Sequence, residues 1–205
     1  MQPELKNLVQ TRIPTRHGEF ILHYYANNVD KKEHVALVKG EVRGQRLVPV
    51  RIHSECFTGD VLGSRRCDCG EQLDMALQMI DESGCGVLIY LRQEGRGIGL
   101  LKKLQAYNLQ DQGMDTVDAN IHLGHRADER EYTIAALILK DLEIESIRLI
   151  TNNPKKIDEL KKLGIDVTDR IPIETEYHSD NVAYLKAKAE KMSHMLTMDK
   201  KDESS

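Results

Sequence analysis

The sequence predicts a mixed α/β fold, in which a β-rich N-terminal half leads into an α/β layer with a C-terminal helix. Two observations carry this prediction. Short runs of β-forming residues, punctuated by glycines, occupy residues 19–25, 35–38 and 47–52. After residue 69 the signals for helix and strand alternate, which is typical of helices that pack on a sheet.

The alternating part begins with a helix and a buried strand. Leu73, Ala76, Leu77 and Ile80 recur at spacings of three and four residues, which predicts a helix from residue 69. The remaining elements follow in order: an apolar strand at 87–91, a helix near 100–112, a strand at 147–150, and a helix that Asn153-Pro154 opens and Gly164 closes.

A D-x-x-E motif precedes the helical pattern that starts at Ile134. Its two acidic residues, Asp128 and Glu131, predict a capping box at the start of that helix. A capping role would account for Asp128 without any chemistry, so the motif alone leaves its function open.

The last predicted helix begins near residue 180. Its apolar positions form a narrow seam of Val182, Leu185, Ala189, Met192 and Leu196. The seam packs either on the sheet of its own chain or against a second subunit. We expect a single domain over residues 1–196 and a polar, disordered tail over residues 197–205.

Composition narrows the class of protein. Hydrophobic residues make up 40% and charged residues 30% of the chain, which suits a folded core. No apolar run approaches the roughly 20 residues that span a bilayer, and the N-terminus lacks the features of a signal peptide. We therefore expect a cytoplasmic protein with no membrane partner. The net charge of -4 argues against a broad nucleic-acid surface.

Three closely spaced cysteines, Cys56, Cys67 and Cys69, predict a zinc site, because reduced thiolates are soft ligands that suit zinc. A catalytic zinc keeps one coordination position open for water, whereas a structural zinc has four protein ligands. Cys85 or His53 would close the site if either supplied the fourth ligand. The sequence leaves both kinds of site possible.

A glycine-rich turn, Arg92-Gln-Glu-Gly-Arg-Gly-Ile-Gly99, follows the strand at 87–91. Glycines allow close approach of the backbone to a ligand, and such turns present N–H groups to anions. Glu94 can accept two N–H bonds from a guanine edge, while Arg96 can only donate. The alternative is a solvated turn with a surface ion pair.

Two lysines, Lys155 and Lys156, stand in the first turn of the helix that Pro154 opens. Positive charge is unfavourable at this end of a helix, so an anionic ligand such as phosphate would stabilise it. The alternative is a pair of exposed lysines that reach into water.

Six motifs in this order resemble GTP cyclohydrolase II, and the resemblance covers about residues 35–196. The motifs are R-x-H-S-E-C-x-T-G-D (51–60), R-C-D-C-G (66–70), R-Q-E-G-R-G-I-G-L (92–100), L-Q-D-Q-G-x-D-T (109–116), A-D-E-R (127–130) and T-N-N-P-K-K (151–156).

The resemblance implies a hydrolase that opens the imidazole ring of GTP and releases formate and pyrophosphate. Its product would be 2,5-diamino-6-(5-phosphoribosylamino)pyrimidin-4(3H)-one, in the first step of riboflavin biosynthesis. The resemblance also implies one Zn²⁺ per subunit on Cys56, Cys67 and Cys69, and Mg²⁺ with the triphosphate. The activated water would attack C8 of the purine.

The resemblance also assigns residues. It gives Asp128 as proton acceptor, Arg130 as the proposed nucleophile toward the α-phosphorus, and Tyr107 as an active-site tyrosine. It implies GTP contacts from Arg51, Ile52, His53, Ser54, Glu55, Gln72, Glu94, Gly95, Arg96, Thr116, Thr151 and Lys156.

Three further expectations complete the interpretation. The chain before Arg51 is too short for the dihydroxybutanone-phosphate synthase domain of fused family members, so we expect the single-function form, and a homodimer as in similar enzymes. Arg130 is an awkward nucleophile because its guanidinium has no free lone pair, and electrostatic stabilisation fits equally well. The alternative function is a zinc-stabilised guanine-nucleotide sensor without catalysis.

Overall fold

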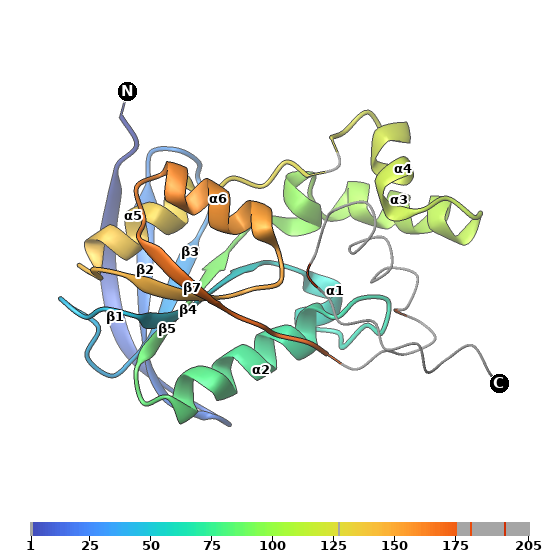
Figure 1. The fold of residues 1–205 in the computed structure, drawn as a ribbon. Coiled ribbons are helices and arrows are strands. Elements are labelled where there is room, and N and C mark those ends of the chain that lie inside the picture. The colour runs from blue at the N-terminus through green and yellow to red at the C-terminus, as the bar shows by residue number, and fades with distance from the viewer. Residues whose placement is uncertain (1, 127, 176–180, 182–194, 196–205) are drawn as a thin grey trace.

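A computed structural model describes residues 2–126, 128–175, 181 and 195. Within these residues the chain forms one seven-stranded mixed sheet flanked by helices, so the predicted α/β class is confirmed (Figure 1). The strands are β1 (Leu5–Thr15), β2 (Gly18–Asn27), β3 (His34–Lys39), β4 (Val48–Ser54), β5 (Gly86–Leu91), β6 (Ile147–Ile150) and β7 (Val167–Ile171).

The sheet has an antiparallel half and a parallel half, in the order β1-β2-β3-β5-β4-β6-β7. β1, β2 and β3 form an antiparallel meander whose last strand pairs with β5. β5, β4, β6 and β7 are mutually parallel. From β4 the chain moves first to β5 on one side and then to β6 on the other, which makes the β4–β6 boundary a topological switch point.

Helices cover both faces of the parallel half (Figure 1). α2 (Cys69–Glu82) packs on one face, where its Ala76 and Ile80 join a cluster with Leu88 of β5. α5 (Thr133–Asp141) and α6 (Pro154–Lys162) cover the opposite face. Neighbouring residues of a strand point to opposite faces. Val87 and Ile89 of β5 therefore join a second hydrophobic cluster, on the face that α5 and α6 cover.

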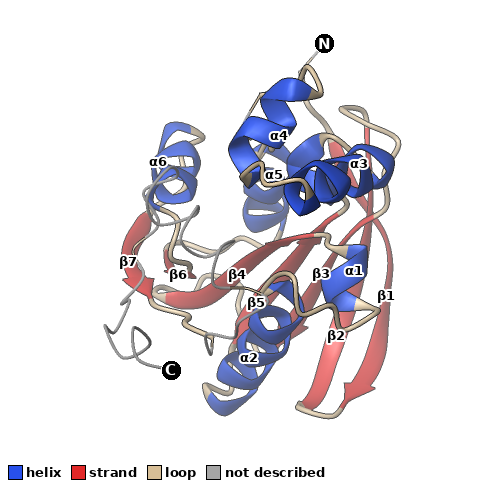
Figure 2. Ribbon diagram, turned by 90° about the vertical axis from the view of Figure 1, so that its right-hand side faces the viewer, coloured by secondary structure: helices blue, strands red, loops and turns tan. Residues whose placement is uncertain are grey.

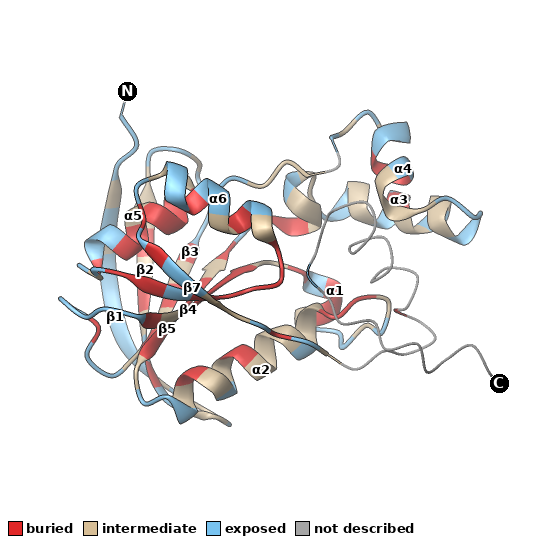
Figure 3. Ribbon diagram, in the orientation of Figure 1, coloured by how far each residue is buried: buried red, intermediate tan, exposed pale blue. Residues whose placement is uncertain are grey.

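Burial follows this layered arrangement (Figure 3). Buried residues fill the central strands and the sheet-facing sides of α2, α5 and α6. The apolar run at 87–91 is explained because β5 is enclosed on both faces. β1 is an exposed edge strand, and it was not predicted as a separate element.

The remaining helical segments lie beyond the carboxyl ends of the parallel strands, and they face the viewer in Figure 2. They are α1 (Phe57–Asp60), the 3₁₀ turn η1 (Glu94–Gly97), α3 (Leu100–Asp111) and α4 (Thr116–His122). None of the helices in the described part of the chain is long and apolar enough to cross a membrane.

One predicted helix start is wrong. α5 begins at Thr133 with Tyr132 at the N-cap, so Asp128 and Glu131 form no capping box. The segment before α5 is instead bound to the residues that follow β5. The side chain of Gln93 donates one hydrogen bond to the backbone of Glu131 and accepts another from it. The predicted C-terminal helix, its apolar seam and the tail at 197–205 lie outside the described residues.

Candidate active site

A cavity opens where β4, β5 and β6 end, and the loops after these three strands supply most of its lining. The β4–β6 ladder stops at Val50 and Leu149, whereas the β4–β5 ladder continues to Ser54 and Leu91. β4 and β6 therefore separate before they end. A crevice at the carboxyl edge of a switch point is where α/β sheets bind ligands.

Two buried cations occupy the gap between β4 and β6. Arg51 Nη1 donates to the carbonyl of Ile150 at 3.0 Å, and Lys156 Nζ donates to the carbonyl of Ile52 at 2.8 Å. These side chains are 6% and 5% exposed, and they replace the hydrogen bonds that the strands would make with each other. Burial lowers the pKa of Arg51, against the opposing charge of Asp68.

Both cations are placed to receive an anion. A buried positive charge interacts strongly with an anion that binds close to it, because little water is present to screen the two charges. Arg51 Nε is buried without a hydrogen-bond partner among the described residues. Of the two lysines in the first turn of α6, Lys155 is exposed and Lys156 is buried, so the alternative of two solvated lysines is wrong for Lys156.

The three cysteines meet at the opposite end of the crevice. Their sulfurs lie within 4.8 Å of one another, and Cys56 Sγ and Cys67 Sγ are 3.6 Å apart. A tetrahedral zinc with bonds of about 2.3 Å to sulfur would separate two sulfurs by about 3.8 Å. The donor set and its spacing therefore fit a zinc ion.

Neither proposed fourth ligand joins this cluster. His53 Nε2 bonds to both carboxylate oxygens of Asp60, at 3.0 and 3.1 Å. Cys85 directly precedes β5, so it lies at the opposite end of that strand from the crevice, and its Sγ donates to the carbonyl of Glu41. Within the described residues the metal-competent group has three members, as an open catalytic site requires.

The pKa values of the three thiols shift in different directions. Hydrogen bonds from Cys67, Cys69 and Lys103 lower the pKa of Cys56 despite its burial. The hydrogen bond with Cys56 raises the pKa of Cys67 to about 11, and Cys69 shifts in the same direction for the same reason. These shifts favour the thiolate at Cys56, and binding of a divalent ion through all three sulfurs would release the remaining thiol protons.

α3 directs two polar side chains at residues 56–58, which contain the first cysteine of the cluster and are called the metal-binding loop below. Lys103 Nζ donates to Cys56 Sγ at 3.0 Å. Tyr107, four residues later on the same helix face, lies 3.4 Å from Thr58 Oγ1 through its hydroxyl. Burial raises the pKa of Tyr107, so the phenol keeps its proton. Lys103 was not predicted, although its spacing from Tyr107 was the available signal.

The glycine-rich turn lies between these two ends. Gly95 and Arg96 both have φ of 62°, and a Cβ on Gly97 would stand 2.9 Å from the carbonyl oxygen of Glu129. A left-handed backbone costs a residue with a Cβ about 1–2 kcal/mol, so the strain at Arg96 marks a conformation that the surroundings impose.

Glu94 is buried within this turn, so the alternative of a solvated turn does not hold for its carboxylate. Its carboxylate accepts hydrogen bonds from Phe57 N at 2.6 Å, Gly95 N at 2.8 Å and Lys103 Nζ at 2.9 Å. A carboxylate offers about four acceptor positions. Glu94 would therefore have to exchange at least one of these bonds to accept two N–H groups from a guanine.

Asp128 and Arg130 form a two-pronged ion pair. Arg130 Nε donates to Asp128 Oδ1 at 2.8 Å, and its Nη2 donates to Oδ2 at 2.5 Å. Burial alone would raise the pKa of Asp128, but the hydrogen bonds and charge of Arg130 lower it. A carboxylate held in this way orients the guanidinium and is a poor proton acceptor.

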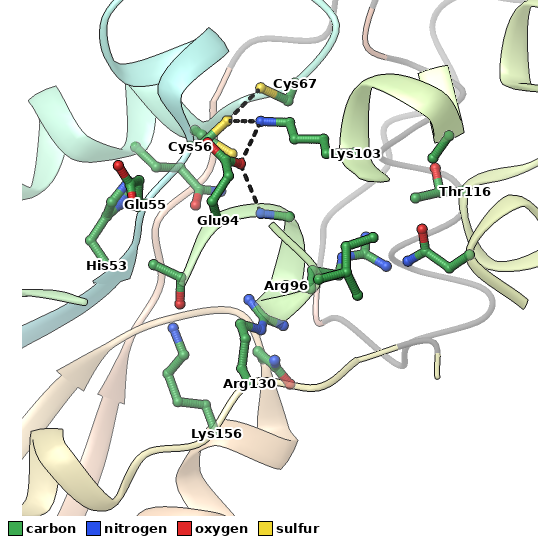
Figure 4. Close-up of a pocket in the computed structure, with 18 of the residues that line it drawn as sticks. His53, Glu55, Cys56, Cys67, Glu94, Arg96, Lys103, Thr116, Arg130 and Lys156 are labelled. Atoms are coloured by element: carbon green, nitrogen blue, oxygen red, sulfur yellow. Dashed lines mark hydrogen bonds and ion pairs between the residues drawn. The ribbon is translucent and has the colours of Figure 1, made fainter. Parts of the chain in front are cut away.

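The crevice is thus polarised (Figure 4). Cys56, Cys67, Glu94 and Lys103 gather at one end, and Arg130 and Lys156 lie at the other. All residues predicted for the site line the cavity except Ile52, whose carbonyl holds Lys156, and Asp128, which holds Arg130. The lining residues that were not predicted are Ile98, Lys103, Ala106, Gln110, Asn120, Asn152 and Asn153.

The fold and the site together define an α/β protein whose crevice joins a thiol cluster able to hold a metal ion to a group of cations. The family described as GTP cyclohydrolase II matches residues 6–172. The chain belongs to the GTP cyclohydrolase II family.

Individual relatives agree with this assignment. The chain is 55% identical over 201 residues to riboflavin biosynthesis protein RibBA of Chlamydia muridarum, covering 98% of the chain and 47% of the relative. It is 53% identical over 190 residues to RibBA of Bacillus mycoides, covering 93% and 48%. The chain spans about half the length of these curated relatives.

A solved structure is also similar, at lower identity. It is RibBX, a two-domain 3,4-dihydroxy-2-butanone 4-phosphate synthase from A. baumannii, with a TM-score of 0.46 and 22% identity. The match covers 84% of this chain and 40% of that one.

Gly59 provides a test of the metal-binding geometry. A Cβ there would lie 3.0 Å from Cys67 Sγ and 3.2 Å from Cys56 Sγ, and its φ is not positive, so alanine fits the backbone. We expect Gly59→Ala to weaken zinc binding by about 10- to 100-fold, as a change next to the ligands does. Competition with a chromogenic chelator measures this affinity.

Gly63→Ala is the matched control. Gly63 has φ of +64°, and a Cβ added there would meet none of the described atoms within 4 Å, so alanine would strain the backbone without touching a sulfur. This variant should lose about 1–2 kcal/mol of stability and keep its zinc affinity. Equal zinc affinities in the two variants would contradict the geometry.

Proposed function

We propose that this chain hydrolyses GTP, opens the imidazole ring, and releases formate and pyrophosphate. The product is 2,5-diamino-6-(5-phosphoribosylamino)pyrimidin-4(3H)-one, so the reaction is the first step of riboflavin biosynthesis. One observation carries the proposal: a thiol cluster and a cation cluster stand at opposite ends of one crevice, with the buried acceptor Glu94 at the thiol end. GTP likewise has a base at one end and a triphosphate at the other.

The metal at the thiol end is zinc, held by Cys56, Cys67 and Cys69. When bound, zinc supplies Lewis-acid activation of the water that hydrolyses the imidazole ring. Mg²⁺ arrives with the triphosphate as part of the substrate. Glu55 and Tyr107 line the crevice near the cysteines and can move protons during ring opening and deformylation.

The chain's cations bind the triphosphate at the other end. Arg51 and Lys156 are fixed by backbone carbonyls, so their charges are in place before the ligand arrives. Glu94 and the adjoining turn face the base. The full set of GTP-binding residues is Arg51, Ile52, His53, Ser54, Glu55, Gln72, Glu94, Gly95, Arg96, Thr116, Thr151 and Lys156.

The oligomeric state, cellular location and domain bounds that we propose follow from the family resemblance. The homodimer and the cytoplasmic location stay predictions. The single domain at residues 1–196 is likewise proposed, since the family match extends over 6–172.

Product analysis tests the proposed function. The zinc-loaded protein, incubated with GTP and Mg²⁺, should release formate and the diaminopyrimidine, and a chelator should stop the reaction. Cys67→Ser should abolish ring opening, while Cys85→Ser should retain it because Cys85 lies outside the cluster. GTP binding without formate would instead favour the non-catalytic guanine-nucleotide sensor.

Arg130 presents a choice between two roles. As a nucleophile it would need Asp128 to take its proton, yet Asp128 is bound through both oxygens and its pKa is lowered. We propose instead that Arg130 stabilises negative charge on the transferring phosphorus, with Asp128 orienting it.

Mass spectrometry of the intact protein during turnover separates these roles. The electrostatic role predicts no guanylyl adduct, and Arg130→Lys should retain part of the pyrophosphate release because it keeps the charge. A guanylyl adduct on Arg130 that forms at the rate of turnover would contradict the electrostatic role.

A further inference from the structure

Lys103 lies between the cysteine cluster and Glu94. Its ammonium is 3.0 Å from Cys56 Sγ and 2.9 Å from Glu94 Oε1, and the lysine and glutamate side chains are 11% and 9% exposed (Figure 4). A lysine that is exposed to water places its charge anywhere its flexible stem can reach. Here one largely covered ammonium is fixed against two groups from separate loops.

The charge of the loaded metal site explains why a cation is needed there. Three thiolates outweigh the charge of one divalent ion, so the loaded centre keeps a net negative charge. Cys56 and Cys67 are buried, and an uncompensated buried charge is strongly destabilising. The Glu94 carboxylate adds a second negative charge beside the same ammonium.

Several other cations near the crevice are committed elsewhere. Arg66 pairs with Asp111 and stacks on the ring of Tyr107, with its guanidinium carbon 4.7 Å from the ring centroid. Arg51 and Lys156 bond to carbonyls at the opposite end of the crevice. Lys103, by contrast, donates directly to a sulfur of the cluster.

We propose that Lys103 is a positioning residue whose ammonium compensates the negative charge of the metal-loaded cysteine centre and holds Glu94 against the metal-binding loop. The proposal rests on the metal site of the proposed function and assigns that site an additional residue. It does not require that GTP be turned over.

The same contact joins the base-facing turn to the metal loop. Glu94 Oε2 accepts from Phe57 N, the residue after Cys56, while Glu94 Oε1 accepts from Lys103. Lys103, Cys56, Phe57 and Glu94 therefore form a closed set of contacts between α3, the turn and the start of α1. Loss of the ammonium would leave Glu94 Oε1 with the hydrogen bond from Gly95 N alone and would remove the positive charge beside Cys56 Sγ.

Cobalt-substituted protein gives a readout that depends on this charge. Visible absorption of cobalt thiolates arises from transfer of electron density from sulfur to metal. A cation beside the sulfur stabilises its electrons and raises the energy of that transition. Removing the cation should therefore move the band to longer wavelength, an effect that a purely structural role would not produce.

Three substitutions separate charge from hydrogen bonding. Lys103→Met removes both the charge and the donor, Lys103→Gln keeps a donor without charge, and Lys103→Arg keeps the charge. Lys102→Met removes the neighbouring lysine from the same helix and serves as the matched control. Each variant is measured for its cobalt spectrum and for zinc affinity by chelator competition.

We expect Lys103→Met and Lys103→Gln to shift the cobalt band to longer wavelength and to weaken zinc binding by about 10- to 100-fold. Lys103→Arg and Lys102→Met should resemble the unchanged protein. If Lys103→Met fails to fold, Lys103→Gln decides alone. A band and an affinity in Lys103→Gln equal to those of Lys102→Met would overturn the proposal.

These measurements separate the inference from the proposed function, because neither uses GTP. A protein that binds zinc and shows the expected band shift, yet releases no formate, would refute the hydrolase and support the role of Lys103. A protein that releases formate, with an unshifted cobalt band in both Lys103→Met and Lys103→Gln, would support the hydrolase and refute the role of Lys103.

Discussion

The site depends on the early separation of β4 from β6. Because their ladder ends at Val50 and Leu149, the carbonyls of Ile52 and Ile150 lie beyond the paired part of these two strands. Arg51 and Lys156 donate to these two carbonyls and are buried there with their charges fixed. The opening in the sheet thus creates a crevice and also holds the cations at its base.

The separation of thiols and cations along the crevice depends on which strand precedes each segment that lines it. The segment from the end of β4 to the start of α2 carries the cysteines, and the turn after β5 places Glu94 beside them. The loop after β6 leads into the helix with Lys156 at the other end. The net charge of -4 for the whole chain conceals this local separation of charge. A molecule with a base at one end and phosphates at the other matches it, and the family assignment points to the same ligand.

Much of this arrangement could be predicted from the sequence, for identifiable reasons. β5 and α2 were predicted because their apolar patterns are strong, and the cysteines because their chemistry is specific. Asp128 was misread as a helix cap, since its bond to Arg130 and the bonds of Gln93 to Glu131 are tertiary and leave no local signal. Lys103 was missed because its spacing of four residues from Tyr107 is only a weak signal, and its contacts with Cys56 and Glu94 are tertiary.

The most direct test of this account is a crystal structure of the zinc-loaded protein with Mg²⁺ and a GTP analogue that resists hydrolysis. We expect a metal on Cys56, Cys67 and Cys69, the imidazole ring of the base next to it, and the triphosphate against Arg51, Arg130 and Lys156. A triphosphate bound elsewhere, such as over the second cavity lined by Lys31, Lys32 and Arg92, would contradict it.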